Sequence, residues 1–302
     1  MSFAIKHPAI RYHGGKFRLA TWIISHFPAH RCYVEPFGGA ASVLLKKEPS
    51  EAEVYNDLDG DVVNLFRVLR NPATSQALIT ACALTPYSRE EFTNAYTHSD
   101  DPVERARRLV VRATMGFGSA GATKGSTGFR LDTRRNSATA QAVWARQPDN
   151  LAAVASRFSG VLVENRDAIQ CMRDHDTPTT LHFVDPPYVH DTRVEVTKNN
   201  AYRFELTNDA HRQLLSVLKS LSGMVIVCGY NSKLYNDSLS SWKRVTRTTA
   251  ANGRSGSVQR TECIWINPAA QNNQERAHDN PDGAEVRRGF GCSRKTERRT
   301  TT

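Results

Sequence analysis

The sequence predicts an α/β protein built on a doubly wound, mostly parallel sheet of the Rossmann-like type. Short, continuously apolar segments alternate with helical segments along the chain, as in parallel sheets that are covered by helices on both faces. The chain of 302 residues is long enough for one sizeable core with an inserted subdomain. Acidic residues follow several of the expected strands, and such sheets bind ligands at the carboxyl ends of their strands.

Six segments are expected to be strands because each is an apolar or β-branched run that ends at polar or turn-forming residues. They cover residues 32–37, 52–57, 160–165, 181–188, 224–231 and 261–267. The fourth runs into Asp185 and two prolines, which lack the backbone N–H that would extend a ladder. Asp57 and Asp167 follow two other strands, so we expect the three carboxylates at one edge of the sheet.

Four segments are expected to be helices because of their apolar spacing or their end signals. They cover residues 41–47, 61–70, 100–116 and 207–223. The third offers Asp101 as N-cap, Pro102 in the first turn and Glu104 to close a capping box. Gly38 and Gly39 open the first of these helices, so the backbone there can approach a ligand closely.

The composition restricts the class of protein. Six cysteines lie far apart without a C-x-x-C pair, which argues against a metal site and a disulfide scaffold and favours a reducing cytoplasm. No apolar run approaches the length of a membrane span, and no signal peptide is recognisable. Neither G-x-G-x-x-G nor a P-loop follows a predicted strand, so nicotinamide and P-loop nucleotide sites are not expected.

The formal charge of +10 points to a polyanionic partner. Most of the excess lies in residues 103–146, where nine Arg or Lys stand against Glu104 and Asp132. This segment runs from a helix into a long loop of small residues, and such loops in compact domains are usually functional or disordered. Residues 269–302 are polar and lack a core pattern, so they are expected to form a disordered tail.

Four motifs occur in a fixed order: YHGGK at 12–16, VEPFGGAAS at 34–42, YNDLD at 55–59 and VDPPY at 184–188. With these motifs, residues 8–267 resemble the Dam-type (D-P-P-Y) DNA adenine N6-methyltransferases, most closely the members carried by phages and restriction–modification systems. The resemblance implies a Rossmann-like methyltransferase domain that binds S-adenosylmethionine, formed by residues 8–75 and 155–268. Residues 76–154 would be an inserted, mainly helical and loop DNA-recognition subdomain.

The implied activity is site-specific transfer of a methyl group from S-adenosylmethionine to the exocyclic amine (N6) of a flipped adenine in duplex DNA. The implied catalytic residues are Asp185, Pro186, Pro187 and Tyr188. The Asp185 carboxylate and the Pro186 carbonyl would accept hydrogen bonds from the amine and favour the pyramidal nitrogen that attacks the methyl group. Tyr188 would stack on the flipped base. The implied cofactor-binding residues are Tyr12, Lys16, Glu35, Phe37, Gly38, Gly39, Asp57, Asp167 and Asp185.

The implied DNA-binding residues are Arg112, Phe117, Lys124, Arg130, Arg134 and Arg135. The chain departs from the family's usual pattern in two places. Ala41 stands at the last glycine of F-x-G-x-G, and residues 114–121 (TMGFGSAG) replace the run with which GATC-reading members recognise their site. GATC is therefore not assumed to be the target.

Two alternatives stay open at this point. One is an amino-methyltransferase that acts on another base, cytosine in DNA or a base in RNA; the other is a catalytically inactive DNA-binding relative. The expected partner is double-stranded DNA, with a cognate restriction endonuclease as a further candidate and no membrane. The chain is expected to be a monomer in the cytoplasm of a bacterial host or phage-infected cell, associated with the nucleoid.

Overall fold

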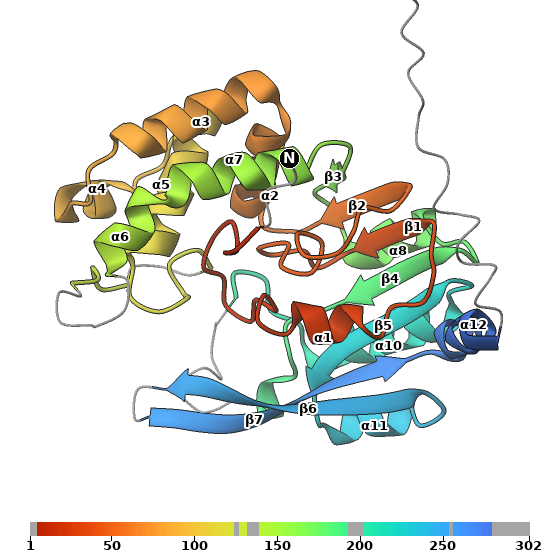
Figure 1. The fold of residues 1–302 in the computed structure, drawn as a ribbon. Coiled ribbons are helices and arrows are strands. Elements are labelled where there is room, and N and C mark those ends of the chain that lie inside the picture. The colour runs from red at the N-terminus through yellow and green to blue at the C-terminus, as the bar shows by residue number, and fades with distance from the viewer. Residues whose placement is uncertain (1–4, 124–126, 132–138, 193–201, 254–255, 280–302) are drawn as a thin grey trace, which may run out of the picture.

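The computed structural model describes residues 5–123, 127–131, 139–192, 202–253 and 256–279. Its strands form one sheet in the order β3-β2-β1-β4-β5-β7-β6, which lies between the helices labelled in Figure 1. The strands are β1 Cys32–Glu35, β2 Ala52–Asn56, β3 Leu162–Glu164, β4 Thr180–Val184, β5 Met224–Tyr230, β6 Lys243–Gly253 and β7 Gly256–Ile266. The prediction of a doubly wound, mostly parallel sheet is confirmed.

The winding of the sheet reverses between β1 and β4. β1 pairs in parallel with β2 on one side and with β4 on the other, so that Val34 aligns with both Val54 and His182. From β1 the chain winds outward through β2 and β3, and from β4 it winds outward through β5. In doubly wound sheets the crevice at such a reversal is the usual ligand site.

The far edge of the sheet is an antiparallel hairpin that the sequence predicted only in part. β7 pairs with β5 and with β6, both antiparallel, and the expected strand at 261–267 covers only its second half. β6 was missed because its first half alternates basic and hydroxyl side chains (KRVTRTT) and lacks an apolar run. The backbone ladder with β7 holds this polar strand in place, and Figure 1 shows the hairpin extending beyond the rest of the sheet.

Side chains of alternate residues fill separate apolar clusters on the two faces of the sheet. On β5, Ile226 belongs to the larger cluster, which also contains Leu65 of helix α2 (Gly60–Arg70) and Leu109 of helix α5 (Pro102–Met115). Val225 and Val227 belong to a second cluster, together with Leu214, Leu215 and Leu218 of helix α10 (Asn208–Ser220). Burial on both faces explains why the central strands have continuous apolar sequences.

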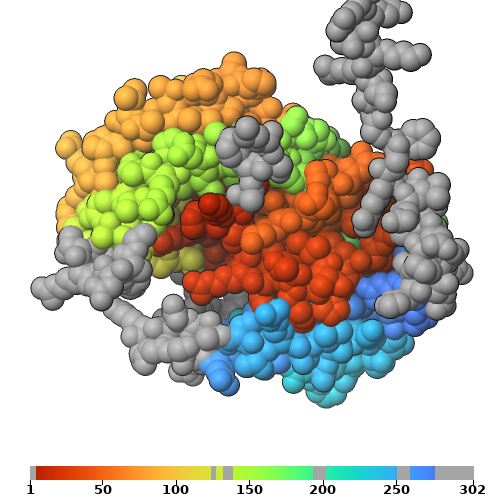
Figure 2. Space-filling view, in the orientation of Figure 1, coloured from red at the N-terminus to blue at the C-terminus, as the bar shows by residue number. Residues whose placement is uncertain are grey.

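The helices fall into two groups along the chain. The segment between β2 and β3 contains α2 Gly60–Arg70, α3 Pro72–Leu84, α4 Arg89–Asn94, α5 Pro102–Met115, α6 Ala140–Ala145 and α7 Gln147–Arg157. The remaining helices are α1 Ala20–Ile24, α8 Ala168–Asp174, the 3-10 turn η1 His190–Thr192, α10 Asn208–Ser220, α11 Lys233–Ser238 and α12 Pro268–Asp279. In Figure 2 the first group (orange to yellow-green) and the hairpin (blue) form separate bulges with the N-terminal segment (red) between them.

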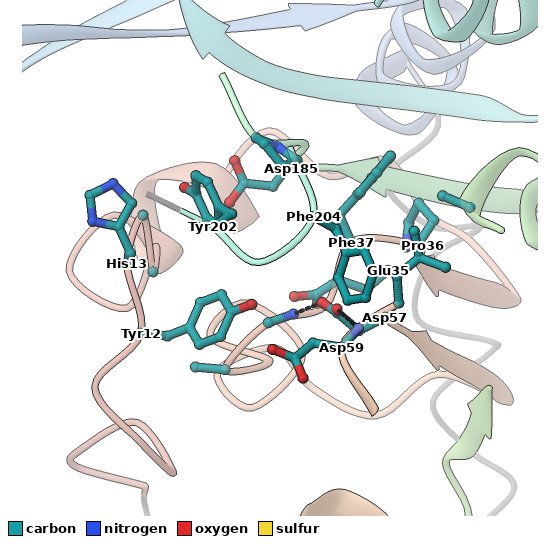
Figure 3. Close-up of a pocket in the computed structure, with 18 of the residues that line it drawn as sticks. Tyr12, His13, Glu35, Pro36, Phe37, Asp57, Asp59, Asp185, Tyr202 and Phe204 are labelled. Atoms are coloured by element: carbon teal, nitrogen blue, oxygen red, sulfur yellow. Dashed lines mark hydrogen bonds between the residues drawn. The ribbon is translucent and has the colours of Figure 1, made fainter. Parts of the chain in front are cut away.

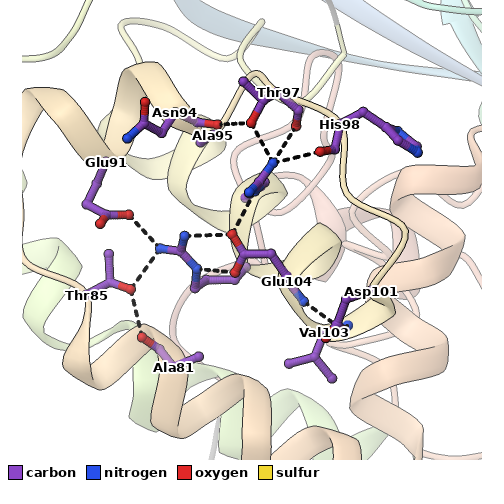
Figure 4. A network of polar contacts seen from close by, with 12 residues as sticks. Ala81, Thr85, Glu91, Asn94, Ala95, Thr97, His98, Asp101, Val103 and Glu104 are labelled. Carbon is purple, nitrogen blue, oxygen red and sulfur yellow. Dashed lines mark hydrogen bonds and ion pairs between the residues drawn. The ribbon is translucent and has the colours of Figure 1, made fainter.

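Helix α5 begins as predicted, except for the capping box. Asp101 is the N-cap and accepts hydrogen bonds from the N–H groups of Val103 and Glu104. Glu104 does not close a box; its two carboxylate oxygens accept from Arg107 and Arg108 instead. Figure 4 shows the Glu104 carboxylate in the middle of this network of polar contacts. Part of the basic excess of this segment is therefore neutralised inside the helical region.

Residues 269–279 form helix α12, so the expectation of a disordered tail is wrong for this part, and residues 280–302 lie outside the described chain. Ala270 is fully buried, although the rest of the helix has no clear apolar face. Asn267 links the helix to the sheet, because its side chain accepts from the N–H groups of Val225 and Ala270. Gln274 donates to the carbonyl of His26. These are polar contacts to the backbone, which apolar periodicity does not reveal.

We expect a chain that ends at Asn267 to be less stable than one that ends at Asp279. The shorter chain loses buried Ala270 and the hydrogen bonds of α12, each worth about 1 kcal/mol. Its thermal midpoint should be lower by about 5 °C, measured by circular dichroism with Gln274→Ala in the longer chain as an intermediate case. Equal midpoints for the two chains would show that α12 contributes nothing to the fold.

Candidate active site

A cavity of about 410 Å³ opens at the carboxyl ends of β1, β2 and β4, where the winding of the sheet reverses. Its walls come from the N-terminal segment, the loops that follow these three strands, and residues 202–206. Figure 3 draws the carboxylates of Asp57 and Asp59 at one end of the cavity and that of Asp185 toward the other. Most of the predicted site residues therefore come together at one place.

Gly38 and Gly39 follow β1 and allow close packing of aromatic side chains. A Cβ on Gly38 would lie 2.1 Å from the Tyr55 ring, and a Cβ on Gly39 would lie 2.8 Å from the Tyr12 ring. Gly39 also has a φ of +46°, which glycine adopts without steric cost. Its N–H donates to Oδ2 of Asp57 at 2.8 Å. The two glycines thus allow the loop after β1 to pack closely against Tyr12, Tyr55 and Asp57.

The prediction of a helix at residues 41–47 is wrong, because this segment forms a series of turns. Ala41 has a φ of +53°, in the left-handed region that does not continue into a helix. Buried Glu35 accepts hydrogen bonds from the Tyr33 hydroxyl at 2.8 Å and from the Leu44 N–H at 3.0 Å. Burial raises the pKa of Glu35 to about 8. Glu35 therefore orders the turns as well as lining the cavity.

Asp57 and Asp59 follow β2 and differ in how their oxygens are used. Asp57 accepts from the N–H groups of Gly39 and Asp59, and burial raises its pKa to about 6. Asp59 caps helix α2 through Oδ1. Its Oδ2 is buried without a hydrogen-bond partner in the described chain, as is Oγ of Ser42, and both residues line the cavity. A ligand with hydroxyl or ammonium groups would satisfy these atoms.

A buried ion pair joins the N-terminal segment to the end of β4. Nζ of Lys16 lies 3.0 Å from Oδ1 of Asp185, and the two side chains are 6% and 16% exposed. Lys16 also donates to the carbonyl of Gly14 at 2.7 Å. Burial alone would lower the pKa of Lys16, but the carboxylates of Asp185 and Glu262 raise it above its ordinary value. The lysine therefore stays charged beside the predicted catalytic carboxylate.

Tyr188 is held by contacts that the sequence did not predict. Its hydroxyl donates to Oε2 of Glu262 on β7 at 2.8 Å, and its ring meets the ring of Tyr230 edge-on at 4.6 Å. The Lys16 ammonium lies 4.7 Å from the centre of the Tyr188 ring. Tyr188 is only 9% exposed. A base that stacks on this ring would need space near Lys16.

Residues 202–206 form a wall of the cavity that the sequence analysis missed. Tyr202 lies against the ring of His13, and a Cβ on Gly14 would lie 2.1 Å from its hydroxyl. Arg203 bonds to Asp59 at 2.9 Å and to Asp61 at 3.0 Å. The segment has no helix or strand pattern, so only its aromatic and basic composition (YRFE) could have drawn attention to it.

The cavity does not include every predicted cofactor residue. Asp167 is exposed and caps helix α8 by accepting from the N–H of Gln170, while its neighbour Ala168 lines the cavity. The other predicted cofactor contacts all line the cavity: Tyr12, Lys16, Glu35, Phe37, Gly38, Gly39, Asp57 and Asp185. Of the catalytic set, Pro187 lines it with Asp185, whereas Pro186 and Tyr188 are buried next to it.

The predicted DNA-binding residues fall into three groups. Phe117 and Arg130 lie side by side, because Phe117 donates its N–H to Gly128 and Arg130 donates to Met115; the Phe117 side chain is 66% exposed. Arg112 is largely buried and donates to the carbonyl of Ala95. Lys124, Arg134 and Arg135 lie outside the described residues.

The described residues contain neither a membrane-spanning helix nor a cluster of metal-binding side chains. Every helix there is too short or too polar to cross a lipid bilayer. No three His, Cys, Asp or Glu side chains of the described chain meet in a way that could hold a metal ion.

Comparison with known proteins finds relatives and a family for this chain. The chain is 33% identical over 117 residues to the DNA adenine methylase of Escherichia coli (strain K12), covering 36% of this chain and 40% of that protein. It is 38% identical over 68 residues to the DNA adenine methylase of Haemophilus influenzae, covering 22% of this chain and 23% of that protein. The matched regions thus span less than half of these relatives. Residues 12–251, most of the chain, match the model of one protein family. The chain belongs to this family, the D12 class N6 adenine-specific DNA methyltransferases.

Proposed function

We propose that this chain transfers a methyl group from S-adenosylmethionine to the N6 amine of an adenine that is flipped out of duplex DNA. The observation that carries the proposal is the buried Asp185 carboxylate, which lies at the end of β4 and lines the same cavity as Asp57 and Asp59. One cavity thus offers a carboxylate for the reacting amine and two for a cofactor. We propose that the chain acts as a monomer in the cytoplasm of a bacterial host or phage-infected cell.

The residues at the Asp57 end of the cavity fit S-adenosylmethionine. Asp57 would accept hydrogen bonds from the ribose hydroxyls, and the unpartnered Oδ2 of Asp59 offers a further acceptor. Phe37 and the Tyr12 ring provide apolar surface on the cavity wall. The bound cofactor would supply an electrophilic methyl group on its sulfonium.

The residues at the other end fit the adenine amine. The lone pair of this nitrogen is delocalised into the base, so the amine is a weak nucleophile until acceptors hold its N–H bonds. Asp185 and the carbonyl of Pro186 would be those acceptors, and charge-assisted hydrogen bonds of this kind are worth about 1.5–3 kcal/mol each. The rigid Pro186–Pro187 segment would hold both acceptors in place before the base arrives.

Lys16 has two effects on this step. Burial raises the pKa of Asp185, and the Lys16 ammonium opposes that rise, which helps to keep the carboxylate ionised. The ammonium also lies over the Tyr188 ring, where the flipped base would stack. Base entry therefore requires Lys16 to shift along the face of this ring while it remains near Asp185.

We expect Asp185→Asn to reduce methyl transfer by at least about a hundredfold. The amide oxygen is a weaker hydrogen-bond acceptor than the carboxylate, and the amide NH₂ group is a donor that cannot accept from the N–H bonds of adenine. Methylated adenines would be mapped in DNA from cells that express each variant, and turnover would be measured with purified protein. Asp237→Asn is the matched control. Asp237 also pairs with a lysine, Lys233, but this ion pair lies on the surface and is far more exposed than the ion pair of Asp185 with Lys16. Near-normal turnover of Asp185→Asn with intact DNA binding would rule out the mechanism, and absence of methyladenine with the parent chain would rule out the activity.

We expect cofactor affinity to fall as the pH drops below about 6. Burial raises the pKa of Asp57 to about 6, and the ionised carboxylate is the better acceptor for ribose hydroxyls. Affinity should be constant above this pKa and weaken by up to about tenfold for each pH unit below it. Calorimetric titration with S-adenosylmethionine between pH 5 and 8 measures this, with Asp57→Asn as the variant that removes the dependence. An unchanged pH profile in Asp57→Asn would show that another group titrates.

A further inference from the structure

A second cavity, of about 440 Å³, adjoins the active site, because Tyr202 and Arg203 line both cavities. Its other walls come from the start of α2, the turn that precedes α5, one side of α5, and residues 122–123. Nothing in the proposed reaction uses this space. We therefore consider which ligand the residues that line this cavity could bind.

The lining is strongly cationic. Four guanidinium groups, those of Arg105, Arg108, Arg112 and Arg203, share the walls with a single carboxylate, Asp61. Ser99 adds a hydroxyl group and Tyr96 an aromatic ring, whereas the hydroxyls of Thr97 and Thr123 donate to the carbonyls of Asn94 and Ala120. Guanidinium and hydroxyl donors in this combination suit the oxygens of a phosphate group.

Asp61 holds three of these arginines in position. It accepts from Nε of Arg105 at 2.6 Å, from Arg203 at 3.0 Å, and from Arg112 at 3.5 Å. Burial alone would raise the pKa of Asp61, but Arg105 and Arg203 lower it below its ordinary value. The carboxylate therefore stays ionised and fixes the arginines without neutralising all of their charge.

Arg105 has the most donor capacity left for a ligand. Among the described residues only its Nε is engaged, by Asp61, and its side chain is 36% exposed. Arg107, two positions along α5, is the contrasting case: Nε and both terminal nitrogens bond to Glu104, Glu91 and Thr85, and its side chain is 15% exposed. Arg107 supports the helical region, whereas Arg105 lines the cavity and has terminal nitrogens that no described residue engages.

We propose that this second cavity binds a backbone phosphate of the DNA substrate, with Arg105 as the principal contact. The proposal rests on the proposed function, since it assigns a DNA contact to a chain that acts on DNA. The shared wall of Tyr202 and Arg203 places the contact beside the cavity that would receive the flipped base. A phosphate there would position the strand and carry no sequence preference.

Arg105→Gln tests the assignment, with Arg67→Gln as control because Arg67 is an exposed arginine in the last turn of α2, away from the cavity lining. Affinity for short duplexes would be measured by fluorescence anisotropy over a series of salt concentrations. Arg105→Gln should bind all sequences about tenfold more weakly, and the slope of log affinity against log salt should become shallower by about 0.9. Arg105→Lys should keep the slope, and Arg67→Gln should change neither quantity.

A duplex in which one phosphate at a time is replaced by a neutral methylphosphonate locates the contact. One replacement should weaken binding by the parent chain and have no further effect on Arg105→Gln. An unchanged salt slope in Arg105→Gln, or loss confined to one target sequence, would overturn the phosphate assignment. If the parent chain binds and methylates DNA, and Arg105→Gln has the same affinity and salt slope, the phosphate assignment is wrong but the proposed function stands. If the parent chain binds no duplex, the proposed function itself is wrong.

Discussion

The buried ion pair between Lys16 and Asp185 is the interaction on which the rest of the site depends. It joins a residue near the N-terminus to the carboxyl end of β4, and both side chains are almost out of contact with water. Losing one partner of such a pair leaves an uncompensated buried charge, at a cost of about 3–5 kcal/mol. The pair thereby holds the N-terminal segment against the sheet, and with it the wall of the cavity that Tyr12 and Gly14 form.

The same ion pair defines a chemical constraint on the proposed reaction. Lys16 satisfies Asp185 electrostatically and covers the ring of Tyr188, so the end of the cavity is stable without a substrate. The neutral amine of adenine cannot replace the Lys16 ammonium as the counter-charge of Asp185. Lys16 therefore has to stay close to Asp185 while the base enters. Glu262 makes this possible, because it adds a second carboxylate beside Lys16 and holds the hydroxyl of Tyr188.

Sequence patterns predicted the sheet and the position of the cavity because these depend on local signals. Apolar runs marked the central strands, and Asp57 and Asp185 marked where two of them end. The failures have identifiable causes in tertiary structure. The turns after Gly39 depend on the buried carboxyl group of Glu35, and helix α12 depends on polar contacts of Asn267 and Gln274. The 202–206 wall has no regular backbone, so periodicity could not reveal it.

The charge of the chain shows why composition alone overestimates a binding surface. Residues 103–146 carry most of the excess positive charge, yet Arg107 and Arg108 share Glu104, and that carboxylate belongs to the same helix. Arg107 joins Glu104 of α5 to Glu91 of α4, two carboxylates that Figure 4 labels. Arg105, Arg112 and Arg203, by contrast, share Asp61, with Asp59 as a second partner of Arg203 alone. The positive charges therefore outnumber the carboxylates at the wall of a cavity. The number of arginines in a segment predicts that it attracts a polyanion. Which of these arginines can bind the polyanion depends on how many carboxylates already pair with each of them.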